Sequence, residues 1–276
     1  MRIIDAISLG ILQGLTEFLP VSSSGHLAVG QKLLGYKATE LILFDVIVHL
    51  GTLAAILWVY RSSLVQYVNG SRKVLLGGGE GSMTSRFWGE SSMREVSWIV
   101  LATIPTGIIG VVFRKPLTAM FDSMSAIACF FAVTGVLLWV TRWALGGAKD
   151  IASLSWYHPL ILGVAQGIAI LPGISRSGTT IAVALLLGMR RDESARISFL
   201  MAIPAIAGAT ILELRKLDGI PQDWLAILIG GLAAVVSGYL ALLFLIRLVK
   251  QGQLSWFSIY LWLLAGGILL KVHVLA

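Results

Sequence analysis

Six long apolar stretches alternate with polar segments along this chain. They are Leu41–Tyr60, Val96–Phe113, Ser123–Val140, Ile197–Leu212, Trp224–Ile246 and Trp256–Leu275. Most of them approach the roughly 20 residues that a helix needs to cross a bilayer. With 57% apolar and 13% charged residues and a mean hydropathy of +0.88, the chain has too few polar residues to cover a water-soluble globule. The pattern therefore predicts an all-α polytopic integral membrane protein.

One polar, glycine-containing segment occurs twice, at residues 10–35 and 163–188. The first copy contains LPVSSSGH and the second contains LPGISRSGTT. A single constant offset pairs Gly10 with Gly163, Gln13 with Gln166, Gly25 with Gly178 and Gly35 with Gly188. Because three apolar stretches follow each copy, the chain is predicted to hold two repeats in one membrane domain, residues 1–145 and 156–276.

Both copies are apolar at their ends, but proline, glycine and clustered hydroxyl groups interrupt them near the middle. The backbone groups freed by such a break are tolerated at membrane depth only where the chain is buried in protein or lines a wet cavity. We therefore expect two re-entrant helical hairpins, each followed by three transmembrane helices. The three intervening spans make the second hairpin enter from the opposite side, so the halves are predicted to be inverted repeats whose hairpin tips meet.

The net charge of +7 is explained by cations that face anionic lipid headgroups, so it requires no nucleic-acid partner. Lys and Arg are more numerous on the predicted side of Arg61 and Arg94 than on that of Arg2 and Lys271, which favours the first side as cytoplasmic. Both termini and the first hairpin then lie on the outer side. Residues 70–92, rich in Gly and Ser, are expected to form a flexible cytoplasmic loop.

The first break concentrates polar residues where hydrocarbon is expected: Glu17, Ser22, Ser23, Ser24, Gly25 and His26. Ionisable groups at membrane depth are costly, so a functional role is the default hypothesis. Glu17 and Gln13 share one helix face, and they either hold a hard divalent cation, orient His26 or hydrogen-bond a neighbouring helix. His26 follows the serines and is predicted to act as a general base or to activate a nucleophile, rather than to be a structural histidine.

The second break contains Ser175, Arg176, Ser177, Gly178 and Thr179. Small polar residues often serve only helix packing. Here, however, both breaks present hydroxyls and free N–H groups at the start of a helix, which suits a tetrahedral oxyanion. The hydroxyls and amides of both breaks, Ser22, Ser24 and Gly25 included, are therefore predicted to bind phosphate. Arg176 either forms a structural ion pair with Glu17 or binds phosphate bidentately, and the second role is favoured.

Asp45 and His49 lie four residues apart on one face of the next span. They are predicted to pair with each other, to bind the same metal or to line the approach to the site. A supporting role is favoured.

The segments GLTEFLPVSSSGH at Gly14–His26 and LPGISRSGTT at Leu171–Thr180 resemble the two signature motifs of the undecaprenyl-diphosphate phosphatase family, also called bacitracin-resistance proteins. The resemblance extends over essentially the whole chain, including the FDVIVHLGT stretch. It implies a bacterial plasma-membrane enzyme that hydrolyses undecaprenyl diphosphate to undecaprenyl phosphate and inorganic phosphate. Such an enzyme recycles the lipid carrier for peptidoglycan synthesis and confers bacitracin resistance.

The resemblance also implies site residues: the acidic motif corresponds to Gln13 and Glu17, the serine-histidine motif to Ser22, Ser23, Ser24 and His26, and the arginine motif to Ser175, Arg176, Ser177 and Thr179. Many members have Glu where this chain has Gln13, so Glu17 is the acidic group expected to matter. The family further implies Mg²⁺ or Ca²⁺ dependence, re-entrant helices, inverted repeats and a site open to the outer face.

The diphosphate is expected at the hairpin tips, with its polyprenyl tail between helices in lipid. Ser23 activated by His26 is the favoured nucleophile, while attack by water with His26 as base and attack by His26 itself stay open. A polyprenyl-phosphate transporter is the alternative function, because carriers also use inverted repeats, broken helices and buried anion sites. A purely structural membrane protein leaves both polar clusters unexplained. The sequence leaves the oligomeric state open, a homodimer included.

Overall fold

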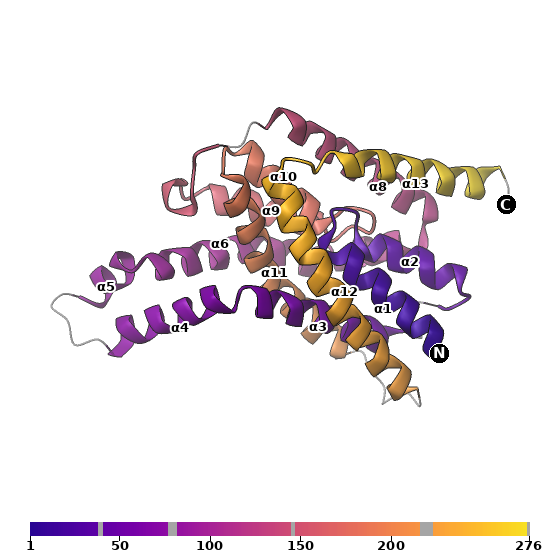
Figure 1. Cartoon of the computed structure of the whole chain (residues 1–276), viewed down its shortest axis with the longest axis horizontal. Coiled ribbons are helices and arrows are strands. Elements are labelled where there is room, and N and C mark those ends of the chain that lie inside the picture. The colour runs from indigo at the N-terminus through magenta and orange to yellow at the C-terminus, as the bar shows by residue number, and fades with distance from the viewer. Residues whose placement is uncertain (38–40, 77–81, 145–146, 216–222, 275–276) are drawn as a thin grey trace.

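A computed structural model describes residues 1–37, 41–76, 82–144, 147–215 and 223–274 (Figure 1). Over these residues the regular secondary structure is helical, apart from one β-bridge between Lys149 and Met189. The α-helices are α1 (Ile3–Phe18), α2 (Ser23–Leu33), α3 (Ile42–Val59), α4 (Arg61–Leu76), α5 (Met83–Gly89), α6 (Ser91–Val112), α7 (Arg114–Ala119), α8 (Met124–Val140), α9 (His158–Ile168), α10 (Arg176–Leu186), α11 (Arg191–Leu214), α12 (Trp224–Lys250) and α13 (Trp256–His273). Short 3-10 turns cover Met120–Asp122, Thr141–Trp143 and Ile151–Ser153.

Six of these helices are long and apolar enough to cross a membrane: α3, α6, α8, α11, α12 and α13. All six predicted spans are confirmed, although position 275 lies outside the described residues. The helices α6 and α11 begin at Ser91 and Arg191, a few residues before the predicted apolar stretches. Their polar first turns continue the helix beyond the apolar stretch, which hydropathy alone does not detect. The chain is therefore a multi-pass membrane protein.

Both predicted breaks are present, and each separates two helices that pack against one another, α1 with α2 and α9 with α10. Ser22 and Ser175 cap the second helix of each pair, because their hydroxyl oxygens accept hydrogen bonds from Gly25 N at 3.4 Å and Gly178 N at 3.0 Å. The same second helices are followed by Gly35 and Gly188, whose φ angles are +81° and +84°. Left-handed backbone of this kind ends a helix and favours glycine.

The first helix of each hairpin packs on a helix from the other half of the chain, α1 on α12 and α9 on α6. A Cβ atom added to Gly10 would lie 2.2 Å from the carbonyl oxygen of Gly230, and one added to Gly163 would lie 2.0 Å from that of Ala102. Glycine at these paired positions therefore permits backbone contact between the halves. The helices α3 and α11 also pack together, as do α8 and α13 (Figure 1). Inversion of the halves across the membrane stays a prediction.

The expected flexible loop over residues 70–92 is wrong for most of its length. The helix α4 continues through Gly70 to Leu76, and α5 covers Met83–Gly89; residues 77–81 lie outside the described residues. Gly70 has a packing role, because a Cβ atom there would lie 2.1 Å from the hydroxyl oxygen of Ser92 at the start of α6. Glycine therefore marks close helix contact here rather than a loop.

A buried aromatic contact holds the end of α1 in the protein core. Phe18 directly follows Glu17 and is fully buried, and its ring lies edge-on to that of Phe199 of α11 at 5.7 Å. Apolar residues of α3, α10 and α12 complete this core cluster. The carboxylate of Glu17 is thus carried on a well-packed backbone.

Candidate active site

The tips of the two hairpins are joined by direct hydrogen bonds. The hydroxyl oxygen of Ser22 accepts from Gly173 N at 3.0 Å, and the hydroxyl of Ser177 donates to the carbonyl oxygen of Phe18 at 2.9 Å. Thr134 of α8 strengthens the second tip, since its hydroxyl donates to Gly173 O at 2.9 Å. These bonds bring the two repeated segments together, as the repeat predicts.

Glycines at the tips make this contact close. A Cβ atom at Gly25 would lie 2.9 Å from Gly173 N, and one at Gly178 would lie 3.0 Å from Cβ of Pro20. Side chains larger than hydrogen would therefore push the two tips apart.

Glu17 lies at the centre of the polar groups that these tips bring together. Its Oε1 accepts a hydrogen bond from Nη2 of Arg176 at 2.7 Å, and its Oε2 accepts from Nε2 of Gln13 at 3.0 Å and from the hydroxyl of Ser23. The side chain of Glu17 is 7% exposed and that of Arg176 is 14% exposed, so this ion pair is largely desolvated. Groups from three separate segments of the sequence thus converge on one carboxylate.

Three buried polar atoms around this pair lack a hydrogen-bond partner among the described residues: Oε1 of Gln13, Nη1 of Arg176 and Oγ1 of Thr179. Thr179 lies one turn after Arg176 on α10, and Gln13 lies one turn before Glu17 on α1. Buried polar groups are nearly always satisfied in folded proteins, so such a cluster is typical of a ligand site. An unpaired guanidinium nitrogen and hydroxyl suit an anion, and an unpaired amide oxygen suits a cation or a proton donor.

The other predicted phosphate ligands are arranged in two ways. Ser22, Ser175 and Ser177 are buried, and their hydroxyl groups are engaged in the caps and the contact between the tips. Ser24 is partly exposed, with its hydroxyl 3.3 Å from that of Ser22. Phosphate binding by these residues stays a prediction.

The imidazole of His26 makes contacts different from those expected. Its Nδ1 bonds to the carbonyl oxygen of Ser22 at 2.8 Å, and its Nε2 bonds to the hydroxyl of Tyr260 of α13 at 2.7 Å. The two rings are stacked, with centroids 5.8 Å apart, and Phe131 lies edge-on to the imidazole. The hydroxyl of Ser23 bonds to Glu17 rather than to His26. Activation of Ser23 by His26 therefore stays a prediction, and it requires the bond to Tyr260 to open.

The side chains of Asp45 and His49 have different partners. The carboxylate of Asp45 accepts from Nε2 of Gln31 at 2.7 Å. His49 bonds through Nδ1 to the backbone carbonyl of Asp45 at 2.7 Å, and its Nε2 lies 4.0 Å from Oε2 of Glu17. His49 thus lies beside the site. The four-residue spacing indicated that Asp45 and His49 are neighbours on one helix, but it gave no sign that His49 lies close to Glu17.

The residues around Glu17 include oxygen donors of the kind that a hard divalent cation prefers. The described residues contain no cluster of three or more His, Cys, Asp or Glu side chains arranged for a metal. Mg²⁺, however, is commonly held by one or two carboxylates together with substrate phosphates and water, and Ca²⁺ also accepts amide oxygens. Glu17 supplies one such carboxylate, and Oε1 of Gln13 is an unpaired amide oxygen, while Nε2 of Gln13 is the atom that faces Glu17.

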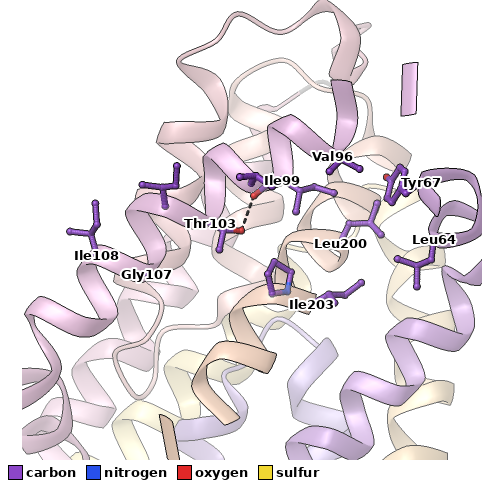
Figure 2. Close-up of a pocket in the computed structure, with 12 residues that line it drawn as sticks. Leu64, Tyr67, Val96, Ile99, Thr103, Gly107, Ile108, Leu200 and Ile203 are labelled. Carbon is purple, nitrogen blue, oxygen red and sulfur yellow. Dashed lines mark hydrogen bonds between the residues drawn. The ribbon is translucent and has the colours of Figure 1, made fainter. Parts of the chain in front are cut away.

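A separate apolar cavity of about 460 Å³ lies between α4, α6 and α11 (Figure 2). Two of its lining residues, Tyr67 and Thr103, bear hydroxyl groups. The hydroxyl of Thr103 donates to the carbonyl oxygen of Ile99 in its own helix at 2.7 Å, and Figure 2 marks this bond with a dashed line. None of the residues around Glu17 lines this cavity, so it is distinct from the polar site.

Similarity to known proteins extends over nearly the whole chain. Residues 6–267 match the family model described as bacitracin resistance protein BacA. An undecaprenyl-diphosphatase of Desulfatibacillum aliphaticivorans is 40% identical over 277 residues, which cover 99% of this chain and 100% of that protein. Similar proteins of the same name occur in Methanobrevibacter smithii, 40% identical over 95% of both chains, and in Desulfosudis oleivorans, 42% identical over 96% of this chain and 97% of that one.

Proposed function

Because this chain belongs to the bacitracin resistance protein BacA family, we propose that it hydrolyses undecaprenyl diphosphate to undecaprenyl phosphate and inorganic phosphate. This reaction returns the lipid carrier to peptidoglycan synthesis, and it counters bacitracin. The reaction takes place in a multi-pass membrane protein, where a lipid-linked substrate is reached directly from the bilayer.

The observation that carries this proposal is the cluster of unpaired polar atoms around the Glu17–Arg176 pair. Arg176 uses only Nη2 on Glu17, so Nη1 is available for a phosphate oxygen, together with the hydroxyl of Thr179. A guanidinium suits this task because its fixed donors match phosphate oxygens. The ion pair with Glu17 is therefore compatible with phosphate binding, although the sequence presented the two as alternatives.

Ser23 is the favoured nucleophile, and Glu17, rather than His26, is the acceptor of its hydrogen bond. In the first step the Ser23 oxygen bonds to the terminal phosphorus, and the bond from that phosphorus to the bridging oxygen breaks. The electron pair goes to the bridging oxygen, which leaves as undecaprenyl phosphate and receives the serine proton through Glu17. Phosphoryl transfer depends mostly on positioning and on stabilisation of charge, which Arg176 supplies.

Gln13 and Glu17 are the residues proposed to hold a divalent cation, Mg²⁺ or Ca²⁺. When bound, such an ion neutralises charge that develops on the phosphoryl oxygens. The protein's own contribution is to orient the carboxylate, through the 3.0 Å bond from Gln13 Nε2 to Glu17.

The enzyme is proposed to act in the bacterial plasma membrane with its site open to the outer face, as the excess of Lys and Arg on the opposite side favours. The polyprenyl tail then lies between helices in lipid, while the diphosphate occupies the joined tips.

Release of inorganic phosphate from undecaprenyl diphosphate by the purified protein in detergent tests this function. Wild-type protein is expected to release phosphate. This release is expected to stop when EDTA removes divalent cations and to resume when Mg²⁺ or Ca²⁺ is added back. Glu17→Gln and Ser23→Ala are expected to reduce release at least about 100-fold, the usual effect of losing a directly acting group.

Arg61→Ala is the matched control, because Arg61 is an exposed cation that packs over Trp58 outside the site. It is expected to keep wild-type release. Pure protein that binds the lipid but releases no phosphate under any metal condition would instead favour a polyprenyl-phosphate transporter.

A further inference from the structure

His49 is a partly exposed histidine beside Glu17 to which the steps above assign no role. It belongs to α3, the first membrane span, and its side chain is 31% exposed. Its Nε2 lies 4.0 Å from Oε2 of Glu17, the oxygen that also accepts the hydroxyl of Ser23. His49 and Ser23 thus approach the same oxygen atom from different helices.

The orientation of His49 is set by its other ring nitrogen. Nδ1 lies 2.7 Å from the backbone carbonyl oxygen of Asp45, which only accepts hydrogen bonds, so Nδ1 carries the hydrogen. In the neutral ring Nε2 is then an acceptor. Two acceptors, Nε2 of His49 and Oε2 of Glu17, therefore face each other across 4.0 Å.

This separation suits a water molecule that donates one hydrogen bond to each acceptor. With hydrogen bonds of about 2.8 Å and the angle of water, two acceptors bridged in this way lie about 4.4 Å apart. A serine hydroxyl carries one hydrogen and satisfies only one of the two, whereas water satisfies both. The pair is thus arranged to hold and orient water.

We propose that Glu17 and His49 hold the water that hydrolyses the phosphoenzyme formed on Ser23; this inference rests on the function proposed above. Once the Ser23 oxygen is bonded to phosphorus it has no hydrogen to donate, so Oε2 of Glu17 becomes available to the water. The water oxygen then bonds to phosphorus, the bond to the Ser23 oxygen breaks with its electron pair on that oxygen, and one water proton passes through Glu17 to the serine. Inorganic phosphate is released and the enzyme is restored.

His26 is less suited to this task, because its Nε2 is bonded to Tyr260 and its Nδ1 to Ser22 O. Its neighbours include the rings of Phe131 and Tyr260. Among the described histidines, His49 is the one with a ring nitrogen within 4.0 Å of a carboxylate oxygen of the site. The assignment therefore gives His49 a water-positioning role that the sequence pattern left undefined.

Two substitutions at His49 distinguish the role of Nε2 from that of Nδ1. Glutamine places an amide oxygen near the position of Nε2, whereas asparagine reaches only the position of Nδ1 and keeps the bond to Asp45. His49→Gln is therefore expected to hold the water, and His49→Asn is not. His158→Asn is the control, because His158 makes the same kind of bond, Nδ1 to Ser155 O at 3.0 Å, on α9.

The test is a pre-steady-state measurement, with substrate in excess over enzyme, that follows undecaprenyl phosphate and inorganic phosphate separately. Wild type, His49→Gln and His158→Asn are expected to release both products together. His49→Asn is expected to release undecaprenyl phosphate at an unchanged rate, about one per enzyme, and phosphate about 100-fold later, as expected when a reacting group is misplaced.

Phosphate that keeps pace with undecaprenyl phosphate in His49→Asn would overturn the inference, and so would equal behaviour of the Asn and Gln variants. Equal melting temperatures for these variants exclude misfolding as the cause of any difference. Failure of the wild-type protein to release either product would refute the proposed function itself, so the two failures are distinguishable.

Discussion

Replacing Arg176 by methionine tests whether the buried ion pair serves catalysis or only stability. Methionine preserves much of the side-chain volume but removes the charge and every donor. Glu17 is then left as a carboxylate that is 7% exposed and has lost its 2.7 Å partner. We expect both the stability and the phosphatase activity of Arg176→Met to fall.

The structure sets the size of the stability change. Removing one partner of a buried ion pair costs about 3 to 5 kcal/mol, and the lower figure applies here because Arg176 retains 14% exposure and Ser23 and Gln13 still bond to Glu17. For a protein of this size, about 3 kcal/mol corresponds to a fall of about 6 to 12 °C in melting temperature. The double variant Glu17→Gln/Arg176→Met removes both charges and is expected to regain most of that loss.

Thermal unfolding in detergent and phosphate release are measured on the same three proteins. Activity is expected to fall at least about 100-fold in the single variant and to stay low in the double variant, because the phosphate-binding donors are absent from both. Recovery of activity together with stability in the double variant would mean that the pair is structural, and the catalytic assignment of Arg176 would be refuted.

Three further changes test the contacts around the site. Gly163→Ala places a Cβ atom 2.0 Å from Ala102 O and is expected to lower the melting temperature by several degrees. Gly266→Ala is the control and is expected to be neutral, because a Cβ atom at Gly266 would have nothing within 4 Å. Equal melting temperatures for the two variants would contradict the close contact of the helices at Gly163. Ser22→Ala leaves Gly173 N without its acceptor and is expected to destabilise the protein by about 1 to 3 kcal/mol in denaturant unfolding. An unchanged denaturant midpoint would argue against the hydrogen bond between the two tips. Tyr260→Phe removes only the hydroxyl bonded to His26 and is expected to lower the free energy of unfolding by about 1 kcal/mol. Phosphate release is expected to stay within about threefold of wild type. A loss of turnover of about 100-fold would instead show that the bond between Tyr260 and His26 is needed for the reaction.

Much of the architecture was predictable because hydropathy reports the solvent around a helix. The six apolar stretches and the two polar breaks follow from that relation alone. The bond from Gln13 to Glu17 follows from helical spacing. Contact between Glu17 and Arg176 was predictable only through the repeat, since duplicated breaks suggest a shared site.

Other contacts depend on tertiary packing, which leaves no local signal. The partner of His26 is Tyr260, 234 residues away on the last helix, and no motif connects them. The approach of His49 to Glu17 depends on how α3 packs against α1. Gly70 was misassigned to a loop because glycine marks both turns and tight helix crossings, and only the neighbouring helix distinguishes the two.

The two hairpins have the same order of helices and breaks but carry different functional side chains. At the offset that pairs Gly10 with Gly163, Ile170 occupies the place of Glu17, and Arg176 occupies the place of Ser23. Gln166, the counterpart of Gln13, bonds to helix neighbours at Thr106 and Met201 instead of to a carboxylate. Two copies of the first half would place two Glu17 carboxylates at the joined tips, and two copies of the second half would place two Arg176 guanidinium groups there, so the buried ion pair requires that the two repeats differ at these positions.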